Sequence, residues 1–333
     1  MKQRAFTIAE LMISLALFSL IAVGLSWLVL SASRAQNGSA QVNGAQNAVR
    51  AAMASLRSDI QMASAGVSSG TLYDWRSTIG NTTVSPIDAE NHSDGPDRIT
   101  LLTVEGGMRG MVINPFFAAS ASGFDTLLNV DSVGLPAATL GIPANSVILI
   151  SDLATGYLLK LNAATVLYNS NQWLWFGIAN PANPSSLPSQ IREGSYVFKS
   201  RWVTYSIDTS TNPPMLMIDP DGPGTATPEP IAEGVEDLQI VLGFDQNGNG
   251  VIESPIGTAA DDDEWAFNVA GEAQPALAKV RQVSVSITAR TPMPESATAQ
   301  VPRFGGDRAA GNTADRYLRR TVTEVITIRS FSL

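Results

Sequence analysis

Hydrophobic and polar positions divide the chain into an apolar start, a striped segment and a long remainder of short apolar runs. Between Phe6 and Leu30, 19 of 25 residues are apolar and Glu10 is the only charged one. At a helical rise of 1.5 Å per residue this stretch would be about 37 Å long, which exceeds the roughly 30 Å hydrocarbon core of a bilayer. The pattern therefore predicts a transmembrane helix over residues 6–30.

A second pattern follows over residues 31–65. Apolar residues recur there at spacings of three and four, which is the period of one helix face. The stripe consists of Val42, Ala45, Val49, Met53, Leu56 and Ile60. We expect residues 31–65 to continue the same helix as an amphipathic half outside the membrane. Gly38 and Gly44 each cost about 1 kcal/mol relative to alanine within a helix, so the helix is expected to be locally less stable there.

Beyond residue 65 the chain turns to β-branched and aromatic runs separated by Gly, Pro, Asn and Ser. They predict strands over residues 97–104, 146–153, 157–169, 172–178, 195–208, 214–219, 235–245, 280–291 and 318–333. The alternation in "VSVSITA" and "VTEVITI" is typical of antiparallel strands with one buried face. The predicted fold class is α+β, with a long helix followed by a large, mainly antiparallel β head over residues 66–333.

Residues 209–233 are rich in Pro and Gly. They are predicted to contain a hairpin connection and then a long loop within one head. The runs on both sides have the pattern of half-buried strands, which favours this interpretation over a linker between two subdomains.

Composition limits the chemistry. Of the 333 residues 44% are hydrophobic and 15% are charged, which is enough apolar material for a sizeable core. The net charge of -9 opposes binding to nucleic acid, so no nucleic-acid partner is expected, while cationic or basic partners stay open. The lack of cysteine excludes disulfides and thiolate metal sites.

Charges near the start indicate an orientation. Lys2 and Arg4 precede the apolar stretch, and Arg34 is the first charge after it. The positive-inside rule then places the N-terminus in the cytoplasm and the remainder outside. A cleavable secretory signal ending near residues 31–33 is an alternative, but its apolar region would normally span about 7 to 15 uncharged residues, and this one is longer and contains Glu10.

Glu10 needs a partner, because a carboxylate within a membrane costs about 2.5 to 3.5 kcal/mol on insertion scales. Cleavage after Ala5 would supply one. Phe6 would become the new N-terminus and Glu10 its fifth residue. The new α-amino group, on the same chain or on a neighbour, would then pair with the carboxylate at low dielectric.

This arrangement resembles the type IV prepilin signature, a basic leader and a small residue followed by Phe-Thr-x-x-Glu at the start of a long apolar helix. Here "KQRA" precedes "FTIAELMISLALF". Most such leaders end in glycine, whereas this one ends in Ala5. The resemblance implies that a prepilin peptidase removes residues 1–5 by cleaving between Ala5 and Phe6 and N-methylates Phe6, and that Glu10 sets register in a filament. A signal anchor with an incidental glutamate is the alternative.

Three later stretches, "IAEGVEDLQIVLGFDQNGNG", "VRQVSVSITARTP" and "RYLRRTVTEVITIRS", resemble the PilW-type minor pilins and, more distantly, the larger minor pseudopilin of type II secretion. The first resemblance implies a pilin-like fold and a minor pilin at or near the pilus tip that primes assembly or supports adhesin display. The expected partners are other minor pilins, the major pilin, the prepilin peptidase and a large tip adhesin. The expected location is a single-pass inner-membrane protein with a periplasmic head, and then the pilus at the cell surface.

The segment "DQNGNGVIE" has the spacing of a calcium loop. Gly250 stands at position 6 for the sharp turn, and Ile256 replaces the bidentate glutamate of position 12, which predicts a weaker site or one completed by an acid of residues 261–264. A polar hairpin turn without metal is the alternative, because Asn-Gly pairs form turns. The predicted Ca²⁺ ligands are Asp245, Asn247, Asn249, the carbonyl of Val251, and Glu253.

Nothing in the sequence predicts an enzyme. His92 is the only histidine, so neither a histidine-based triad nor a multi-histidine metal site can be built. Trp173, Trp175 and Trp202 are expected in the core, and the arginines of residues 316–320 on the solvent face of a strand. Besides the pseudopilin, a calcium-dependent adhesive domain with a simple N-terminal anchor is an alternative function.

Overall fold

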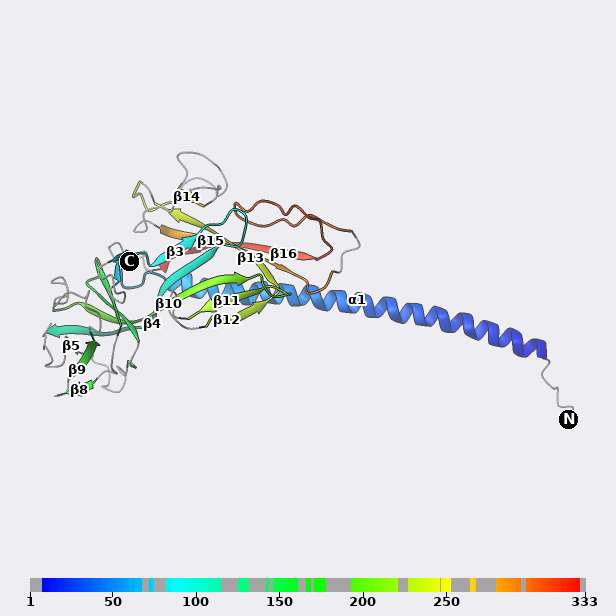
Figure 1. The fold of residues 1–333 in the computed structure, drawn as a ribbon, viewed down its shortest axis with the longest axis horizontal. Coiled ribbons are helices and arrows are strands. Elements are labelled where there is room, and N and C mark those ends of the chain that lie inside the picture. The colour runs from blue at the N-terminus through cyan, green and yellow to red at the C-terminus, as the bar shows by residue number, and fades with distance from the viewer. Residues whose placement is uncertain are drawn as a thin grey trace.

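The computed structural model describes residues 8–67, 72–74, 82–114, 125–131, 142–143, 146–160, 166–168, 171–177, 193–220, 227–245, 247–252, 264–267, 280–294 and 298–329. Its first element is the 55-residue helix α1 (Ile8–Met62), whose N-terminal part projects from a β-rich head (Figure 1). The helix ends in a turn where Gly66 has a φ of 89°. A Cβ at Gly66 would lie 2.9 Å from the ring of Phe198, so glycine is required by both backbone and space.

The larger sheet has twelve strands in the order β2-β1-β7-β6-β10-β4-β5-β9-β8, with β3 beside β4 and the β11–β12 hairpin beside β10. All pairs are antiparallel except β1 with β7. The strands are β1 (Leu72–Asp74), β2 (Thr82–Val84), β3 (Ile87–Glu90), β4 (Arg98–Asn114), β5 (Asp125–Asp131), β6 (Val147–Ser151), β7 (Gly156–Lys160), β8 (Val166–Tyr168), β9 (Asn171–Gly177), β10 (Tyr196–Asp208), β11 (Met215–Asp219) and β12 (Glu229–Glu233).

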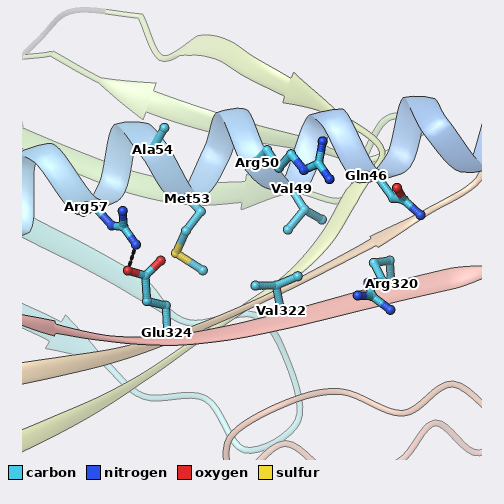
Figure 2. A pocket seen from close by; sticks show the side chains of 9 residues that line it. All are labelled: Gln46, Val49, Arg50, Met53, Ala54, Arg57, Arg320, Val322 and Glu324. Atoms are coloured by element: carbon cyan, nitrogen blue, oxygen red, sulfur yellow. Dashed lines mark ion pairs between the residues drawn. The ribbon is translucent and has the colours of Figure 1, made fainter.

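The smaller sheet has four antiparallel strands in the order β14 (Trp265–Ala266), β13 (Val235–Phe244), β15 (Val280–Arg290) and β16 (Arg319–Thr327). Residues along β13 and β15 are buried almost throughout, whereas residues of β16 alternate and are mostly exposed. Strand β16 therefore forms one edge of this sheet, and Figure 2 shows it running beside α1.

One hydrophobic cluster joins α1 to both sheets. The helix contributes its buried face, the larger sheet contributes residues such as Ile99 and Val203, and the smaller sheet contributes residues such as Leu238 and Val285. All four of these strand residues are fully or almost fully buried. The C-terminal half of α1 is thus part of the core of the head rather than an attachment to it.

The predicted α+β class is confirmed, and each predicted strand run contains strand residues. Two details differ. Residues 229–233, predicted within a loop, form β12, where Pro230 is tolerated because the strand lies at a sheet edge. The run predicted over residues 157–169 contains two strands, β7 and β8, rather than one. The division into residues 1–5, 6–30, 31–65 and 66–333 stays a prediction.

Candidate functional site

The N-terminal half of α1 presents a continuous apolar surface. The large apolar side chains along it are more than half exposed, among them Leu11, Phe18 and Trp27 at 56%, 72% and 76%. This part of the helix is long and apolar enough to cross a membrane, and none of it is buried in the protein. Soluble monomers rarely expose an apolar patch of this size, so lipid or other apolar helices must cover it.

Serine hydroxyls in this half are satisfied within the helix. Ser14 donates to the carbonyl of Glu10 and Ser26 to that of Ala22, each at 2.8 Å. Ser19 and Ser31 donate to carbonyls three residues earlier. Because these polar groups need no partner outside the helix, they add little cost to burial in an apolar environment.

Glu10 lies in the first turns of the described helix and its residue is exposed. It is the only acid in the apolar half of α1. Ala5 and Phe6, the predicted cleavage pair, lie outside the described residues. The pairing of the Glu10 carboxylate with a new N-terminal amine therefore stays a prediction.

The other half of α1 is buried against the head along the stripe predicted from the sequence. The buried residues follow the helical period and together make one face of the helix. They are Ala45, Val49, Ala52, Met53, Leu56 and Ile60. Because leucine or isoleucine truncation in a core costs about 2 to 5 kcal/mol, this face fixes the helix firmly to the head.

A polar cluster reinforces this junction. Asp59 of α1 accepts two 3.1 Å hydrogen bonds from Arg201 Nη2, one at each carboxylate oxygen. The hydroxyl of Tyr205 donates a 2.6 Å hydrogen bond to Asp59 Oδ2 and lies 2.9 Å from the hydroxyl of Ser55. Burial, followed by the contact with Asp59, raises the pKa of Tyr205, so this phenol stays protonated. Nothing in the local sequence pattern singled out these residues.

A groove of about 300 Å³ lies between α1 and β16, and Figure 2 shows the side chains that line it. Val49, Met53 and Val322 supply apolar side chains to it. At one end Arg57 forms an ion pair with Glu324, which joins helix to strand.

Two further arginines line the same groove. Arg50 extends from the helix and Arg320 from the strand, and both residues are exposed. Neither forms an ion pair within the described part of the chain. The groove therefore combines an apolar lining with two uncompensated positive charges, on a protein whose net charge is -9.

A second polar cluster joins the residue before β4 to β13. Asp97 is 1% exposed and accepts hydrogen bonds from the backbone N–H groups of His92 and Ile240 at 2.8 and 2.7 Å. Burial outweighs these bonds and, with the nearby carboxylates of Asp307 and Asp237, raises the pKa of Asp97 to about 7. Burial also raises the pKa of Asp237 to about 6, against the opposing effect of its ion pair with Arg308.

The structure brings most of the predicted calcium ligands into one turn. Asp245 follows the end of β13 and is 3% exposed, and its Oδ2 accepts a 2.8 Å hydrogen bond from the Gly250 N–H. The side chains of Asn247 and Asn249 accept hydrogen bonds from the backbone N–H groups two residues later. Glu253 lies outside the described residues. Among the described residues there is no group of three or more His, Cys, Asp or Glu placed to hold a metal, so the loop depends on amide and carbonyl oxygens.

The remaining candidates have structural roles. Trp202 is buried as expected, while the side chains of Trp173 and Trp175 lie outside the described part. Arg319 was predicted on the solvent face of a strand, but its side chain is only 12% exposed and forms ion pairs with Glu236 and Asp315. The prediction failed there because β16 alone does not reveal the acids that reach it from β13 and the preceding loop.

An apolar helix whose second half is embedded in a mainly antiparallel head defines a protein of the pilin-like class. Two family models match the chain. Residues 204–330 match the type IV pilus-assembly protein W family, and residues 1–26 match the prokaryotic N-terminal methylation motif. The chain thus combines a C-terminal region of the type IV pilus-assembly protein W family with an N-terminal prokaryotic methylation motif. No curated protein and no solved structure matched it.

The family assignment confirms several expectations. A protein of this family is a structural component of the pilus, so the expectation that the chain is not an enzyme is confirmed. The methylation motif implies processing by a prepilin peptidase and assembly with other pilins. Together with the exposed apolar helix it fits a precursor anchored in the inner membrane that is later assembled into a pilus.

Proposed function

We propose that the protein is a minor pilin that is cleaved between Ala5 and Phe6, N-methylated on Phe6 and incorporated at or near the pilus tip. There it primes assembly or supports display of an adhesin. Before assembly its N-terminus faces the cytoplasm and its head the periplasm, in line with the charges of Lys2 and Arg4.

One observation carries this proposal. The same helix exposes an apolar surface over its first half and buries an apolar stripe in the head over its second half. Such a helix serves as a membrane anchor before assembly and as a contact surface among other subunit helices afterwards, without any change of fold. The cost of exposing this apolar surface to water supports movement from lipid into a helical bundle rather than into solvent.

Glu10 sets the register in this scheme. In an apolar bundle an unpaired carboxylate is costly, so the stable position of the helix is the one that brings Glu10 to a positive group. The N-terminal amine of Phe6, on this chain or on a neighbouring pilin, supplies that group after cleavage. An apolar helix of this length can insert despite the cost of one unpaired carboxylate, about 2.5 to 3.5 kcal/mol, so the pairing that follows cleavage gives Glu10 an effect specific to assembly.

The groove between α1 and β16 is the surface we assign to a neighbouring pilin. It is continuous with the helix that enters the filament, and Arg50 and Arg320 are positive charges without partners in the described structure. The contact that fits it is a segment bearing an aspartate or glutamate with apolar flanks. Other minor pilins and the major pilin are the proposed sources of this segment.

N-terminal mass spectrometry of the native protein tests the processing step. The expected mature chain begins at N-methylated Phe6. A chain beginning near Arg34 would indicate an ordinary secreted protein, and an intact Met1 would indicate a simple anchor; either result overturns the proposal.

Replacement of Glu10 by glutamine tests the assembly step. We expect Glu10→Gln to leave membrane insertion and cleavage unchanged and to lower recovery of the protein in sheared pili at least several-fold. Ser14→Ala, one turn later on the helix, is the matched control, because Ser14 bonds only within its own helix in the described structure. Equal recovery of the Glu10→Gln variant and the control contradicts the proposed role.

A further inference from the structure

We propose that the loop after β13 binds calcium through the side-chain oxygens of Asp245, Asn247 and Asn249 and the backbone carbonyl of Val251. The inference concerns the head alone and does not depend on the pilus function proposed above. It rests on the conformation of the loop and on one buried oxygen atom.

The loop has the conformation that a short calcium loop needs. The carboxylate at position 1 accepts the N–H of position 6, Gly250, so the turn closes back onto Asp245. Gly248 and Gly250 have φ angles of 77° and 85°, in the left-handed region that favours glycine. A Cβ at either glycine would meet nothing within 4 Å, so backbone conformation rather than crowding requires glycine at both positions.

The independent observation is the second oxygen of Asp245. Its side chain is 2% exposed, and Oδ1 is a buried atom with no hydrogen-bond partner in the described structure. The Oδ2 atom is occupied by the Gly250 N–H, and the nearest guanidinium nitrogen of Arg281 is 3.8 Å from Oδ2, a long ion pair. Burying an ionised carboxylate with an oxygen unsatisfied is costly. A cation bound at Oδ1 would remove this cost.

The ligand types favour calcium over other cations. Calcium accepts six to eight oxygens in flexible geometry, including carboxylate, amide and backbone carbonyl oxygens, and water completes its shell. Magnesium demands near-octahedral geometry and releases its water reluctantly. Only one carboxylate is present among the four described ligands, so we expect a dissociation constant of about 10⁻⁴ to 10⁻³ M, the range of extracellular calcium modules.

The test uses the full chain purified in detergent micelles. Calcium binding is measured by titration calorimetry and thermal unfolding, and Tb³⁺ luminescence provides a local signal. Trp265 is suited to sensitise Tb³⁺, because it pairs with Gly243, two residues before Asp245, and its ring lies against that glycine. We expect one saturable site, a rise of several degrees in the unfolding temperature with millimolar Ca²⁺, and no comparable rise with Mg²⁺.

Asp245→Asn is the decisive variant, because it removes the charge and keeps an acceptor for the Gly250 N–H. We expect it to weaken calcium binding at least tenfold and to abolish the Tb³⁺ signal. In a chelator it should be as stable as the natural chain or more so, since the unsatisfied buried charge is gone. Asn249→Ala, on the exposed part of the loop, should also weaken binding and provides a second variant if Asp245→Asn does not fold.

Asp152→Asn is the matched control. Asp152 lies in an exposed turn between β6 and β7, where its Oδ1 accepts the N–H groups of Ala154 and Thr155 at 2.9 and 2.6 Å. This substitution should leave calcium binding unchanged. The proposal is overturned if the folded chain takes up no calcium at 10 mM, if Asp245→Asn binds calcium as tightly as the natural chain, or if that variant is destabilised equally with calcium and with chelator, as a purely structural ion pair with Arg281 would require.

Discussion

The hydroxyl of Tyr205 donates a 2.6 Å hydrogen bond to Asp59, which joins strand β10 of the head to the last turns of α1. The two residues are 146 positions apart in sequence. Tyr205 is fully buried and the Asp59 side chain is 13% exposed, so water is a poor substitute for either partner. The bond therefore contributes to the junction through which the helix is held by the head.

Removal of that hydroxyl should destabilise the junction. We expect Tyr205→Phe to lower the free energy of unfolding by about 1 to 3 kcal/mol, because Asp59 loses a donor while it stays largely buried. Denaturant unfolding of the full chain in micelles measures the change. Tyr196→Phe on the same strand is the control, since no hydrogen bond of its hydroxyl occurs in the described structure. Equal midpoints for the two variants would show that the bond is energetically neutral.

Two buried acids, Asp97 before β4 and Asp237 on β13, predict a pH dependence of stability. The folded-state pKa values of Asp97 and Asp237, about 7 and 6, lie above the ordinary value of 3.8, so the folded protein binds protons that the unfolded chain has released. The stability that these two acids contribute to the folded protein is complete below pH 4 and is lost as the pH rises through 6 to 7. The unfolding temperature should therefore fall between pH 5 and pH 8.

Asp97→Asn tests the origin of this pH dependence. An amide is neutral at every pH, so the variant should lose a large part of the fall between pH 5 and pH 8. Asp88→Asn on β3 is the control, because Asp88 is exposed. A slope that is unchanged in Asp97→Asn would place the titrating group elsewhere.

Charge reversal in the groove between α1 and β16 should impair assembly and not folding. Arg50 and Arg320 are exposed and unpaired in the described structure, so the double variant Arg50→Glu, Arg320→Glu should unfold within about 0.5 kcal/mol of the natural chain. Its recovery in sheared pili should fall several-fold, because an acidic partner segment is then repelled. Arg303→Glu, an exposed arginine outside this groove, is the control. Normal recovery of the double variant would exclude the groove as a contact for pilins.

Gly44→Ala should stabilise α1. Gly44 is exposed within the helix, and a Cβ there would meet nothing within 4 Å. The helix propensity of alanine is better by about 1 kcal/mol, so the unfolding temperature should rise. Gly66→Ala is the opposite case and should destabilise, because the residue has a positive φ and no space beside Phe198. If Gly44→Ala folds more stably yet assembles poorly, local flexibility of the helix at residue 44 contributes to assembly.

The helix and its buried face could be predicted because both depend on local periodicity. The stripe from Ala45 to Ile60 follows the 3.6-residue period, and packing required no change to it. Most of the longer strands were visible for the same reason, although the seven-residue β5 was not predicted. Strands β1, β2 and β3 have only three or four residues each, too few for a period to be recognised.

Contacts between distant segments could not be predicted in this way. Asp59 stands on the helix as one more polar residue until Arg201 and Tyr205 reach it from β10. Arg319 is part of an evidently basic run, and its burial depends on Glu236 in another strand. The Asp245 loop could be predicted, because its turn depends on the spacing of residues within one short segment and not on contacts with distant segments.

The shared core of helix and sheets decides where the chain can be shortened. A protein that starts near Ala40 keeps every buried residue of α1 and should be soluble and monomeric without detergent. One that starts after Ile60 would leave the apolar faces of two sheets open to water and should aggregate. The N-terminal part of α1 can therefore be removed without unfolding the head only as far as the start of its buried face at Ala45.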